Sequence, residues 1–307
     1  MIIVTGAAGF IASHFCRKLN AHGIKNIILV DDFTQEIKRN NWENLEYVDK
    51  IQRHLFFLWA VKNVQHIDFI FHLGARTDYF STNQEIFEEL NIDFSQRVWS
   101  FATLHRIPLA YATSYLTNET PHQSFYAKSK FVFDKWIDKQ KQTPPFWSGL
   151  KFFQVYGKNE EHKAENASNV YKIYKNFTEI NDCRDAMHCI STEKNIIQDY
   201  IYVNDISKVL FYFLNHVPPS GIYEVGTGFA RPLRAVVEAL NKVTKLDLEK
   251  LRTAAPVGAS SAKLITNYEL QDNDCFIYQA DLSPLRKYAY KRPFLSLEQG
   301  VKSMLRG

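Results

Sequence analysis

The sequence predicts an α/β protein with a doubly wound parallel sheet and a smaller C-terminal lobe. Two patterns indicate this fold class. In the first half, short β-branched apolar runs alternate with amphipathic segments, which is typical of a parallel sheet covered by helices on both faces. After about residue 156 the alternation loosens into polar segments such as Gly157–Asn169, although helical patterns recur. That change in pattern predicts a second, less regular lobe.

Five apolar runs have the length and composition of strands buried on both faces. They are Ile2–Thr5, Asn26–Asp31, Phe69–Leu73, Leu109–Thr113 and Gly149–Phe153.

Amphipathic segments between and after these runs predict helices. Gly23 is a plausible C-cap for the first, and Pro108 and Pro144 stop the next two. The expected helices are Phe10–His22, Gln84–His105, Tyr126–Lys141, Val170–Phe177, Asp205–Asn215, Leu233–Val243 and Leu295–Leu305.

Composition excludes several classes of protein. With 307 residues, 46% hydrophobic and 23% charged, the chain is neither disordered nor fibrous. Its 37 basic and 33 acidic residues give a net charge of only +4, and the basic residues are scattered, so we expect no nucleic-acid partner. The longest apolar run, Leu55–Val61, is too short to span a membrane, so we expect no membrane partner either.

The four cysteines, Cys16, Cys183, Cys189 and Cys275, form no CxxC pair and no metal-binding spacing. We therefore expect free thiols, no metal site and a reducing, cytoplasmic location. The N-terminal Met-Ile-Ile-Val-Thr-Gly has no basic leader and is expected to be structured from its start.

A glycine-rich loop follows the first predicted strand and opens into a helix. Gly6 allows the tight turn, Gly9 allows close approach of a pyrophosphate to the backbone, and Ala12 allows the helix to pack near the strand. Asp31 ends the next strand, where a carboxylate can bond a ribose hydroxyl. The loop therefore predicts a Rossmann-like dinucleotide site.

The acidic pair Asp31-Asp32 suits the free 2′-hydroxyl of NAD, whereas Lys38 or Arg39 close behind can accept the 2′-phosphate of NADP. The residues leave this choice open.

Tyr126 and Lys130 lie one helical turn apart on one face. A nearby ammonium lowers the pKa of a phenol from about 10 towards the working pH and so provides a base for a hydroxyl proton. The chain holds a second copy of this spacing, Tyr171 with Lys175. Only Tyr126 begins a helix after a strand that ends in a hydroxyl, Ser114, so we expect Tyr126 to be the functional copy.

Together, the loop, Ser114 and Tyr126-x-x-x-Lys130 resemble the extended short-chain dehydrogenases/reductases that act on nucleotide sugars. Within that group the chain is most similar to the ADP-L-glycero-D-manno-heptose 6-epimerases. The supporting segments are Phe71-His72-Leu73-Gly74-Ala75, Val155-Tyr156-Gly157, His162-Lys163, Gly221-Ile222-Tyr223, Gly226-Thr227-Gly228 and Gln279-Ala280-Asp281-Leu282. His162-Lys163 is the most specific of them.

This resemblance implies a redox cycle at one sugar carbon: bound NADP⁺ removes hydride from C6″, the ketone turns over, and hydride returns to its other face. It assigns acid/base roles on opposite faces to Tyr126 and Lys163, with Lys130 holding the nicotinamide ribose. NADP is the implied cofactor, with NAD as the alternative. A nucleotide-diphosphate sugar is the implied substrate, and a homo-oligomer the implied assembly.

The resemblance also assigns cofactor contacts beyond Gly6 and Gly9. They are Phe10, Ile11, Asp31, Asp32, Lys38, Lys50, Leu73, Gly74, Ala75, Arg76, Thr77, Asn91, Lys130 and Val155.

Two domains follow from these assignments. Residues 1–156 form the dinucleotide-binding domain, and residues 157–307 mostly form a substrate-binding lobe. Within the second, Ile196–Leu214 and Gly221–Gly228 return to the main domain. No Gly/Ser linker separates the two parts, so we expect one compact body with a ligand cleft between them.

Departures from the family pattern fall on the substrate side. Ser114 and Tyr126 are 12 residues apart, about half the spacing in relatives. Gln198 stands where relatives have a diphosphate-binding Arg, which lowers the expected diphosphate affinity unless Lys172, Lys175 or Arg184 compensates. The substrate-side positions are Gln154, Glu165, Lys172, Gln198 and Asp274.

Three functions remain compatible with the sequence. One is an active epimerase of an ADP-heptose, another is a different nucleotide-sugar oxidoreductase, and the third is a cofactor-binding protein without catalysis. The intact Ser114, Tyr126 and Lys130 favour an enzyme. A dehydratase is disfavoured, because Leu116 occupies the position where those enzymes usually have an acid.

Overall fold

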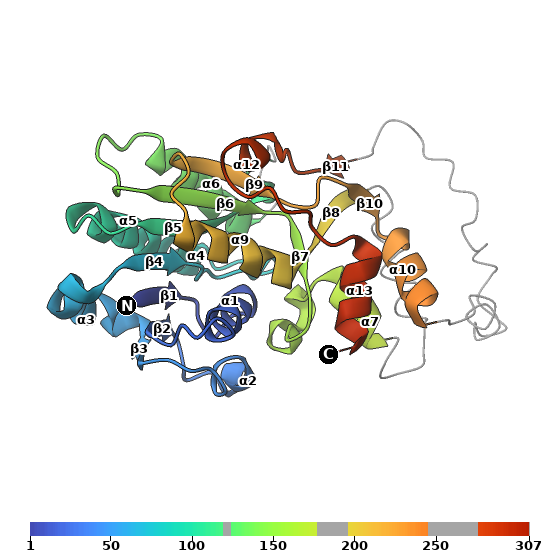
Figure 1. Ribbon diagram of the computed structural model, residues 1–307, viewed down its shortest axis with the longest axis horizontal. Helices are drawn as coiled ribbons and strands as arrows, with labels where there is room; N and C mark the ends of the chain where they lie inside the picture. The colour runs from blue at the N-terminus through green and yellow to red at the C-terminus, as the bar shows by residue number, and fades with distance from the viewer. Residues whose placement is uncertain (119–123, 177–195, 245–275, 307) are drawn as a thin grey trace.

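The computed structural model describes residues 1–118, 124–176, 196–244 and 276–306. They form a main lobe built on a seven-stranded sheet and a small lobe built on a short sheet, seen at the left and right of Figure 1.

Seven parallel strands form the sheet of the main lobe, in the order β3-β2-β1-β4-β5-β6-β9. Their bounds are β1 Ile2–Thr5, β2 Ile27–Asp31, β3 Asp49–Gln52, β4 Phe69–His72, β5 Leu109–Ser114, β6 Trp147–Phe152 and β9 Gly221–Val225. The predicted fold class is confirmed, because the five expected strands all lie in one doubly wound parallel sheet.

Helices cover both faces of this sheet because successive side chains of a strand point to opposite faces. Val4 belongs to the core beneath α1 (Phe10–Asn20) and α9 (Val203–Asn215). Its neighbour Ile3 belongs to the core on the opposite face. That opposite core includes buried residues of α3 (Phe56–Asn63), α5 (Phe94–Leu104) and α6 (Phe125–Ile137).

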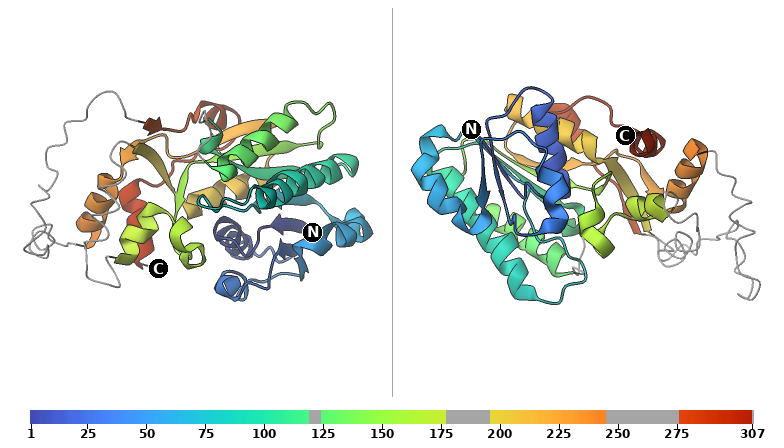
Figure 2. Two further views of the ribbon diagram at one scale, coloured as in Figure 1. Left: turned by 180° about the vertical axis from the view of Figure 1, so that it is seen from behind. Right: turned by 90° about the horizontal axis from the view of Figure 1, so that it is seen from below.

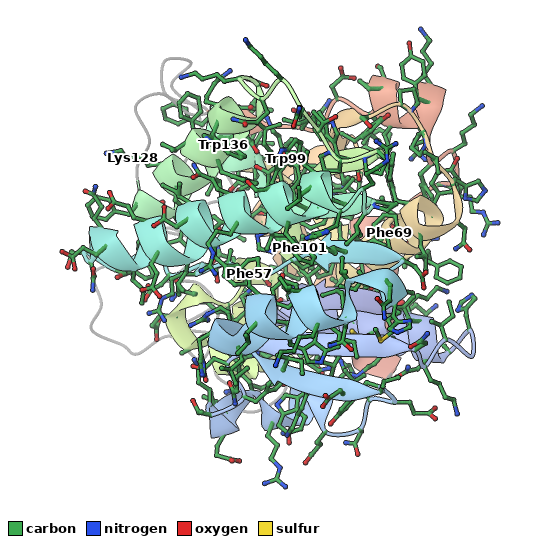
Figure 3. The ribbon with its side chains drawn as sticks, turned by 90° about the vertical axis from the view of Figure 1, so that its left-hand side faces the viewer. Phe57, Phe69, Trp99, Phe101, Lys128 and Trp136 are labelled. Atoms are coloured by element: carbon green, nitrogen blue, oxygen red, sulfur yellow. The ribbon has the colours of Figure 1, made fainter. Side chains whose placement is uncertain are left out.

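Aromatic side chains join the helices of this second layer, which faces the viewer in Figure 3. The ring centroids of Phe57 and Phe94 lie 5.3 Å apart, and those of Trp99 and Trp136 lie 6.4 Å apart. These contacts fix α6, the helix that carries Tyr126, against α5.

The small lobe has β8 at its centre, paired with β7, β10 and β11. These strands are β7 Gln154–Tyr156, β8 Ile196–Tyr202, β10 Ala230–Pro232 and β11 Phe276–Tyr278. Three helices share its core, α7 Asn169–Lys175, α10 Arg234–Thr244 and α13 Leu297–Arg306. Figure 2 shows the three helices on the side of the molecule away from β1–β3. The remaining short helices are α2 Arg39–Trp42, α4 Gln84–Phe87 and α12 Ser283–Tyr288.

Two predicted segments are divided in the structure. Ile196–Leu214 was expected to return to the main domain as one piece, but β8 belongs to the small sheet and only α9 packs on the main lobe, against α1. The expected helix Gln84–His105 is interrupted by a π-helical segment, Glu88–Asp93, between α4 and α5.

Among the described residues, no helix is long and apolar enough to cross a membrane. Most of the apolar run Leu55–Val61 lies in α3, which packs one face on the sheet through Phe56 and Ala60.

Candidate active site

The loop between β1 and α1 can exist only with glycine at its first position. Gly6 has a φ of +69°, and a Cβ there would lie 2.5 Å from the Cα of Gly74. A Cβ on Gly9 would lie 2.9 Å from the carbonyl oxygen of Gly6. No side chain caps the N-terminus of α1, so its backbone N–H groups are available to a phosphate. The loop therefore fits the pyrophosphate of a dinucleotide.

Asp31 lies at the end of β2, beside this loop. Its carboxylate accepts hydrogen bonds from the backbone N–H of Ala8 at 2.9 Å and of Asp32 at 2.7 Å. Burial raises its pKa, and Lys38, whose Nζ lies 3.8 Å from Oδ1, opposes that shift. The carboxylate of Asp32 instead binds Thr34 and Gln35, and these hydrogen bonds lower its pKa to about 2.

Tyr126 lies in the first turn of α6, whose N-cap is Ser124. The Ser124 hydroxyl accepts a hydrogen bond from the N–H of Ala127 at 3.2 Å. Ser114, the last residue of β5, forms a side-chain hydrogen bond with Tyr126. Burial raises the pKa of the Tyr126 phenol to about 12, while this hydrogen bond acts in the opposite direction.

Lys130 is buried one turn further along α6, and its Nζ donates to the carbonyl oxygen of Ala112 at 2.8 Å. Burial lowers the pKa of its ammonium to about 8, against the effect of the Asp134 carboxylate. The expectation of a lowered Tyr126 pKa is therefore wrong for the chain alone. Burial dominates there, and the Lys130 ammonium bonds a carbonyl.

The second copy of the motif lies elsewhere. Tyr171 belongs to α7 and is buried in the core of the small lobe, outside the lining of the cavity. Of the two motif copies, the pair Tyr126 and Lys130 lines the large cavity described below, and the pair Tyr171 and Lys175 does not.

The π-helical segment positions Asn91, whose side chain is fully buried. Its Oδ1 accepts from the N–H of Arg76 at 2.7 Å, and its Nδ2 donates to the carbonyl of Arg76 and to the Ser129 hydroxyl, each at 2.9 Å. Asn91 thus connects the loop after β4 to the helix of Tyr126. π-Bulges are frequently found at functional sites.

Lys163 approaches from the small lobe. Its Nζ lies 2.7 Å from Oε2 of Glu160 and 5.0 Å from the ring centroid of Phe10. Glu160 is fully buried, and it also accepts hydrogen bonds from the N–H of Gly157 and from the N–H and hydroxyl of Ser168. Glu160 thus binds four donors and fixes the position of the Lys163 side chain.

His162, the other half of this dipeptide, lies against the main lobe. Its Nδ1 lies 3.1 Å from the Nδ2 of Asn41, which also donates to the carbonyl of Ala8 in the glycine loop. Burial lowers the pKa of His162 to about 4, and the nearby cations Lys38 and Lys163 act in the same direction.

One cavity of about 1470 Å³ lies between the lobes, at the carboxyl ends of the parallel strands. Most sequence-predicted site residues line it: Gly6, Gly9, Phe10, Ile11, Asp31, Asp32, Lys38, Leu73, Gly74, Ala75, Arg76, Thr77, Ser114, Tyr126, Lys130, Gln154, Val155, Lys163, Glu165, Lys172 and Gln198.

Two assigned residues are placed differently. Asn91 is buried behind the lining, and Lys50 has its Nζ 3.9 Å from the ring centroid of Trp42, outside the cavity. Asp274 lies outside the described residues, as do Cys183, Cys189, Cys275 and Arg184. Cys16 is a buried free thiol.

On the substrate side, the side-chain amides of two glutamines bind the phenol of one tyrosine. The Nε2 atoms of Gln154 and Gln198 both donate to the Tyr115 hydroxyl, at 2.8 Å and 3.4 Å. The amide that replaces the family's arginine is therefore directed at a neighbouring side chain.

Several lining residues were not predicted from the sequence, among them Arg53, Tyr79 and Tyr115. Arg53 follows β3, whose residues Asp-Lys-Ile-Gln show no apolar run. Tyr115 comes two residues after a predicted strand, and Tyr79 lies in the loop that follows another. Open parallel sheets bind their ligands at this end of the strands, and that position was the available signal.

Known families and curated proteins include relatives of this chain. Residues 2–226 match the model of the NAD dependent epimerase/dehydratase family. The ADP-L-glycero-D-manno-heptose-6-epimerase of Fusobacterium nucleatum is 32% identical over 98% of this chain and 96% of its own length.

Solved structures share the fold. The ADP-L-glycero-D-manno-heptose-6-epimerase of Helicobacter pylori has a TM-score of 0.72 at 20% identity, covering 99% of this chain and 94% of that one. A UDP-glucuronic acid 4-epimerase mutant from Bacillus cereus, solved with NAD, has a TM-score of 0.75 at 17% identity over 99% of this chain and 97% of its own. With the glycine loop, the Ser114–Tyr126 pair and a family match over most of its length, the chain belongs to the NAD-dependent epimerase/dehydratase family.

Proposed function

We propose that the chain epimerises C6″ of an ADP-glycero-manno-heptose with NADP as a permanently bound cofactor. One observation carries the proposal: Tyr126 of the main lobe and Lys163 of the small lobe line the same cavity. An epimerase needs proton-transfer groups on both faces of the reacting carbon, and these two side chains belong to elements far apart in the sequence. The Fusobacterium nucleatum relative supports the choice of sugar.

The residues present fit a dinucleotide, because Gly6 and Gly9 leave the space that a Cβ would fill and the α1 N-terminus has no side-chain cap. When bound, the oxidised cofactor accepts a hydride and returns it, and it brings a positive ring charge to the site. Lys130 holds the ribose and fixes the first turns of α6 through Ala112.

Tyr126 takes the proton of the sugar hydroxyl as the alcohol becomes a ketone, and Ser114 orients that oxygen through its bond to the phenol. Burial opposes the phenolate, so a positive charge beside the ring is what makes this step favourable. Lys163, positioned by its ion pair with Glu160, donates the proton when hydride returns to the other face.

NADP is favoured over NAD by the cations at the ribose end. Lys38 and Arg53 both line the cavity beside Asp31, where a 2′-phosphate lies in NADP-binding members of such folds. Denaturing the purified protein and identifying the released dinucleotide by mass spectrometry tests this choice. NAD alone would contradict it.

A different nucleotide sugar is the second candidate, favoured by Gln154 and Gln198. Their amides bind Tyr115 and supply no charge for a diphosphate. Incubation with ADP-D-glycero-D-manno-heptose and separation of the two C6″ epimers decides between the candidates. Absence of epimerisation by cofactor-loaded protein would replace the heptose with another nucleotide sugar.

A homo-oligomer in the cytoplasm completes the proposal. Support comes from Leu55, Leu58 and Val61 of the α3 region, which are apolar and exposed, and from the buried free thiol of Cys16. Light scattering on the purified protein measures the assembly, and a mass of 35.8 kDa would contradict the oligomer.

A further inference from the structure

Two loops from different lobes are bonded to each other at the cavity. The loop after β4 carries Asp78 and Tyr79, and the 3₁₀ segment Glu161–Asn166 lies between β7 and α7 of the small lobe. The Nδ2 of Asn166 donates to Oδ1 of Asp78 at 3.2 Å, and the N–H of Tyr79 donates to Oδ1 of Asn166 at 2.9 Å. A single asparagine thus makes two reciprocal bonds across the lobes.

On the main-lobe side, hydrogen bonds connect this contact to α6, the helix that carries Tyr126. Arg76 binds Oδ2 of Asp78 through Nη2 at 2.8 Å, and its backbone N–H and carbonyl both bind Asn91. Asn91 donates to the Ser129 hydroxyl, which donates to the carbonyl of Tyr126 at 2.7 Å. Asp78 and α6 are therefore parts of one hydrogen-bond network.

The small-lobe side leads to Lys163, three residues before Asn166. Between them Ala164 has a φ of +45° and a ψ of −121°, a conformation that L-residues rarely adopt. Such strain persists only where the surroundings fix the chain on both sides. Glu160 fixes this segment before Lys163, and Asp78 and Tyr79 fix it at Asn166.

Tyr79 extends the contact to the phenol itself. Its ring stands edge-on to that of Tyr126, with centroids 5.2 Å apart and an interplanar angle of 72°. The loop that binds Asn166 therefore also contacts the ring of Tyr126, the expected base.

From these contacts we infer that Asp78 and Asn166 form a clasp that sets Tyr126 and Lys163 at a fixed distance across the cavity. They are positioning residues, and the clasp rests on the proposed function because its purpose is to hold two proton-transfer groups on opposite faces of one carbon. Misplacement of such groups by about 1 Å can cost roughly 10²-fold in rate.

The test uses the full-length protein and the variant Asn166→Ala. Its matched control is Asn204→Ala, which removes another long-range hydrogen bond, 3.3 Å from Oδ1 of Asn204 to Nδ1 of His14, away from the cavity. Asp78→Ala and Asp78→Asn form a second pair, because the asparagine keeps an acceptor for Asn166. Two quantities are measured: amide hydrogen exchange over residues 76–80 without any sugar, and kcat and KM with ADP-D-glycero-D-manno-heptose.

We expect Asn166→Ala to speed amide exchange over residues 76–80 by tenfold or more. It should lower kcat by about 10- to 100-fold with KM changed less than about threefold. Asn204→Ala should match the wild type in both, and Asp78→Asn should retain more kcat than Asp78→Ala.

Unchanged exchange in Asn166→Ala would overturn the clasp, whatever the substrate. Faster exchange with an unchanged kcat would overturn the positioning role. If the wild-type protein does not epimerise the heptose substrate but Asn166→Ala still speeds amide exchange over residues 76–80, the proposed function is overturned and the clasp is retained.

Discussion

The hydroxyl of Tyr126 is buried and forms a hydrogen bond with the side chain of Ser114. Replacing it with Phe keeps the ring and its edge-on contact with Tyr79 but removes the proton acceptor. We expect Tyr126→Phe to lower turnover by about 10²- to 10⁴-fold while the dinucleotide stays bound. Steady-state kinetics and the absorbance of the bound cofactor measure the two effects.

Tyr171→Phe is the matched control, since Tyr171 carries the same motif spacing in the core of the small lobe. It should leave turnover nearly unchanged. Equal losses in the two variants would mean that the fold does not distinguish the two copies.

Lys163 is the side chain on which the heptose assignment depends. Its ammonium is bound to the buried Glu160 and lies over Phe10, so Lys163→Met removes the charge while filling similar space. We expect the variant to lose epimerisation but to retain the first hydride transfer, seen as slow reduction of bound NADP⁺. Stopped-flow absorbance records that half-reaction.

Misfolding would abolish the half-reaction and epimerisation together, so the retained half-reaction is the control. Normal epimerisation by Lys163→Met would remove Lys163 from the mechanism and leave the second face to another donor.

Protonation of His72 makes the free energy of unfolding depend on pH. The ring is fully buried between the hydroxyls of Thr5 and Ser95, and burial lowers its pKa to about 3. The folded chain therefore keeps His72 neutral where the unfolded chain, with a pKa of about 6.5, takes up a proton. This contribution to stability is complete above pH 6.5 and is lost as the pH falls towards 3, about 2 kcal/mol being lost by pH 5.

Urea unfolding at several pH values measures this slope. In His72→Asn the free energy of unfolding should fall less steeply between pH 6.5 and 5, and above pH 7 the two curves should run parallel. An unchanged slope in the variant would show that other groups carry the pH dependence.

At the scale of elements, we propose that the β1–α1 turn controls dinucleotide binding. A Cβ at Gly9 would lie 2.9 Å from the carbonyl of Gly6, so Gly9→Val has to displace the loop that we propose binds the pyrophosphate. We expect the variant to fold but to be purified without dinucleotide and to give no thermal shift with NAD or NADP.

Gly221→Val is the control for this substitution, because nothing lies within 4 Å of a Cβ at that position. It should retain the dinucleotide. Retention of dinucleotide by Gly9→Val would contradict the assignment of the loop.

Regular elements with an apolar period were predictable, and those without one were not. The strands ending at Thr5 and Asp31 were predicted to within a residue. β3 was missed because its residues are mostly polar and partly exposed. The π-helical segment Glu88–Asp93 was missed because one extra residue in a turn leaves the apolar pattern on either side intact.

The residues of the candidate site also divide into those that a local sequence pattern predicts and those that it does not. Gly6, Gly9 and the Tyr126–Lys130 pair are encoded within a few residues of chain, so their arrangement could be expected. The bonds of Asn166 to Asp78 and Tyr79 join positions 88 and 87 residues apart. Such pairs depend on how the lobes meet, which no local pattern describes.

At the scale of the whole molecule, the chain crosses between the lobes more than once. After β7 and β8 of the small lobe, α9 returns to cover α1, and β9 adds to the main sheet beside β6. Residues 1–156 alone would expose the apolar face of α1 and leave β6 as an open edge. We therefore expect that fragment to lack a cooperative unfolding transition.

Calorimetry on the fragment and on the full chain checks this expectation. Addition of residues 157–307 as a separate chain should restore the transition if both fold together. A sharp transition in the fragment alone would mean that α9 and β9 are dispensable.

The late position of β9 also matters during synthesis. β6 is complete at Phe152, but its partner in the sheet begins only at Gly221. At roughly 5–20 residues per second, the ribosome needs several seconds to supply it. Throughout that interval the nascent sheet presents the open edge of β6 to its surroundings. We therefore expect the emerging chain to be prone to pairing with other strands until β9 is made.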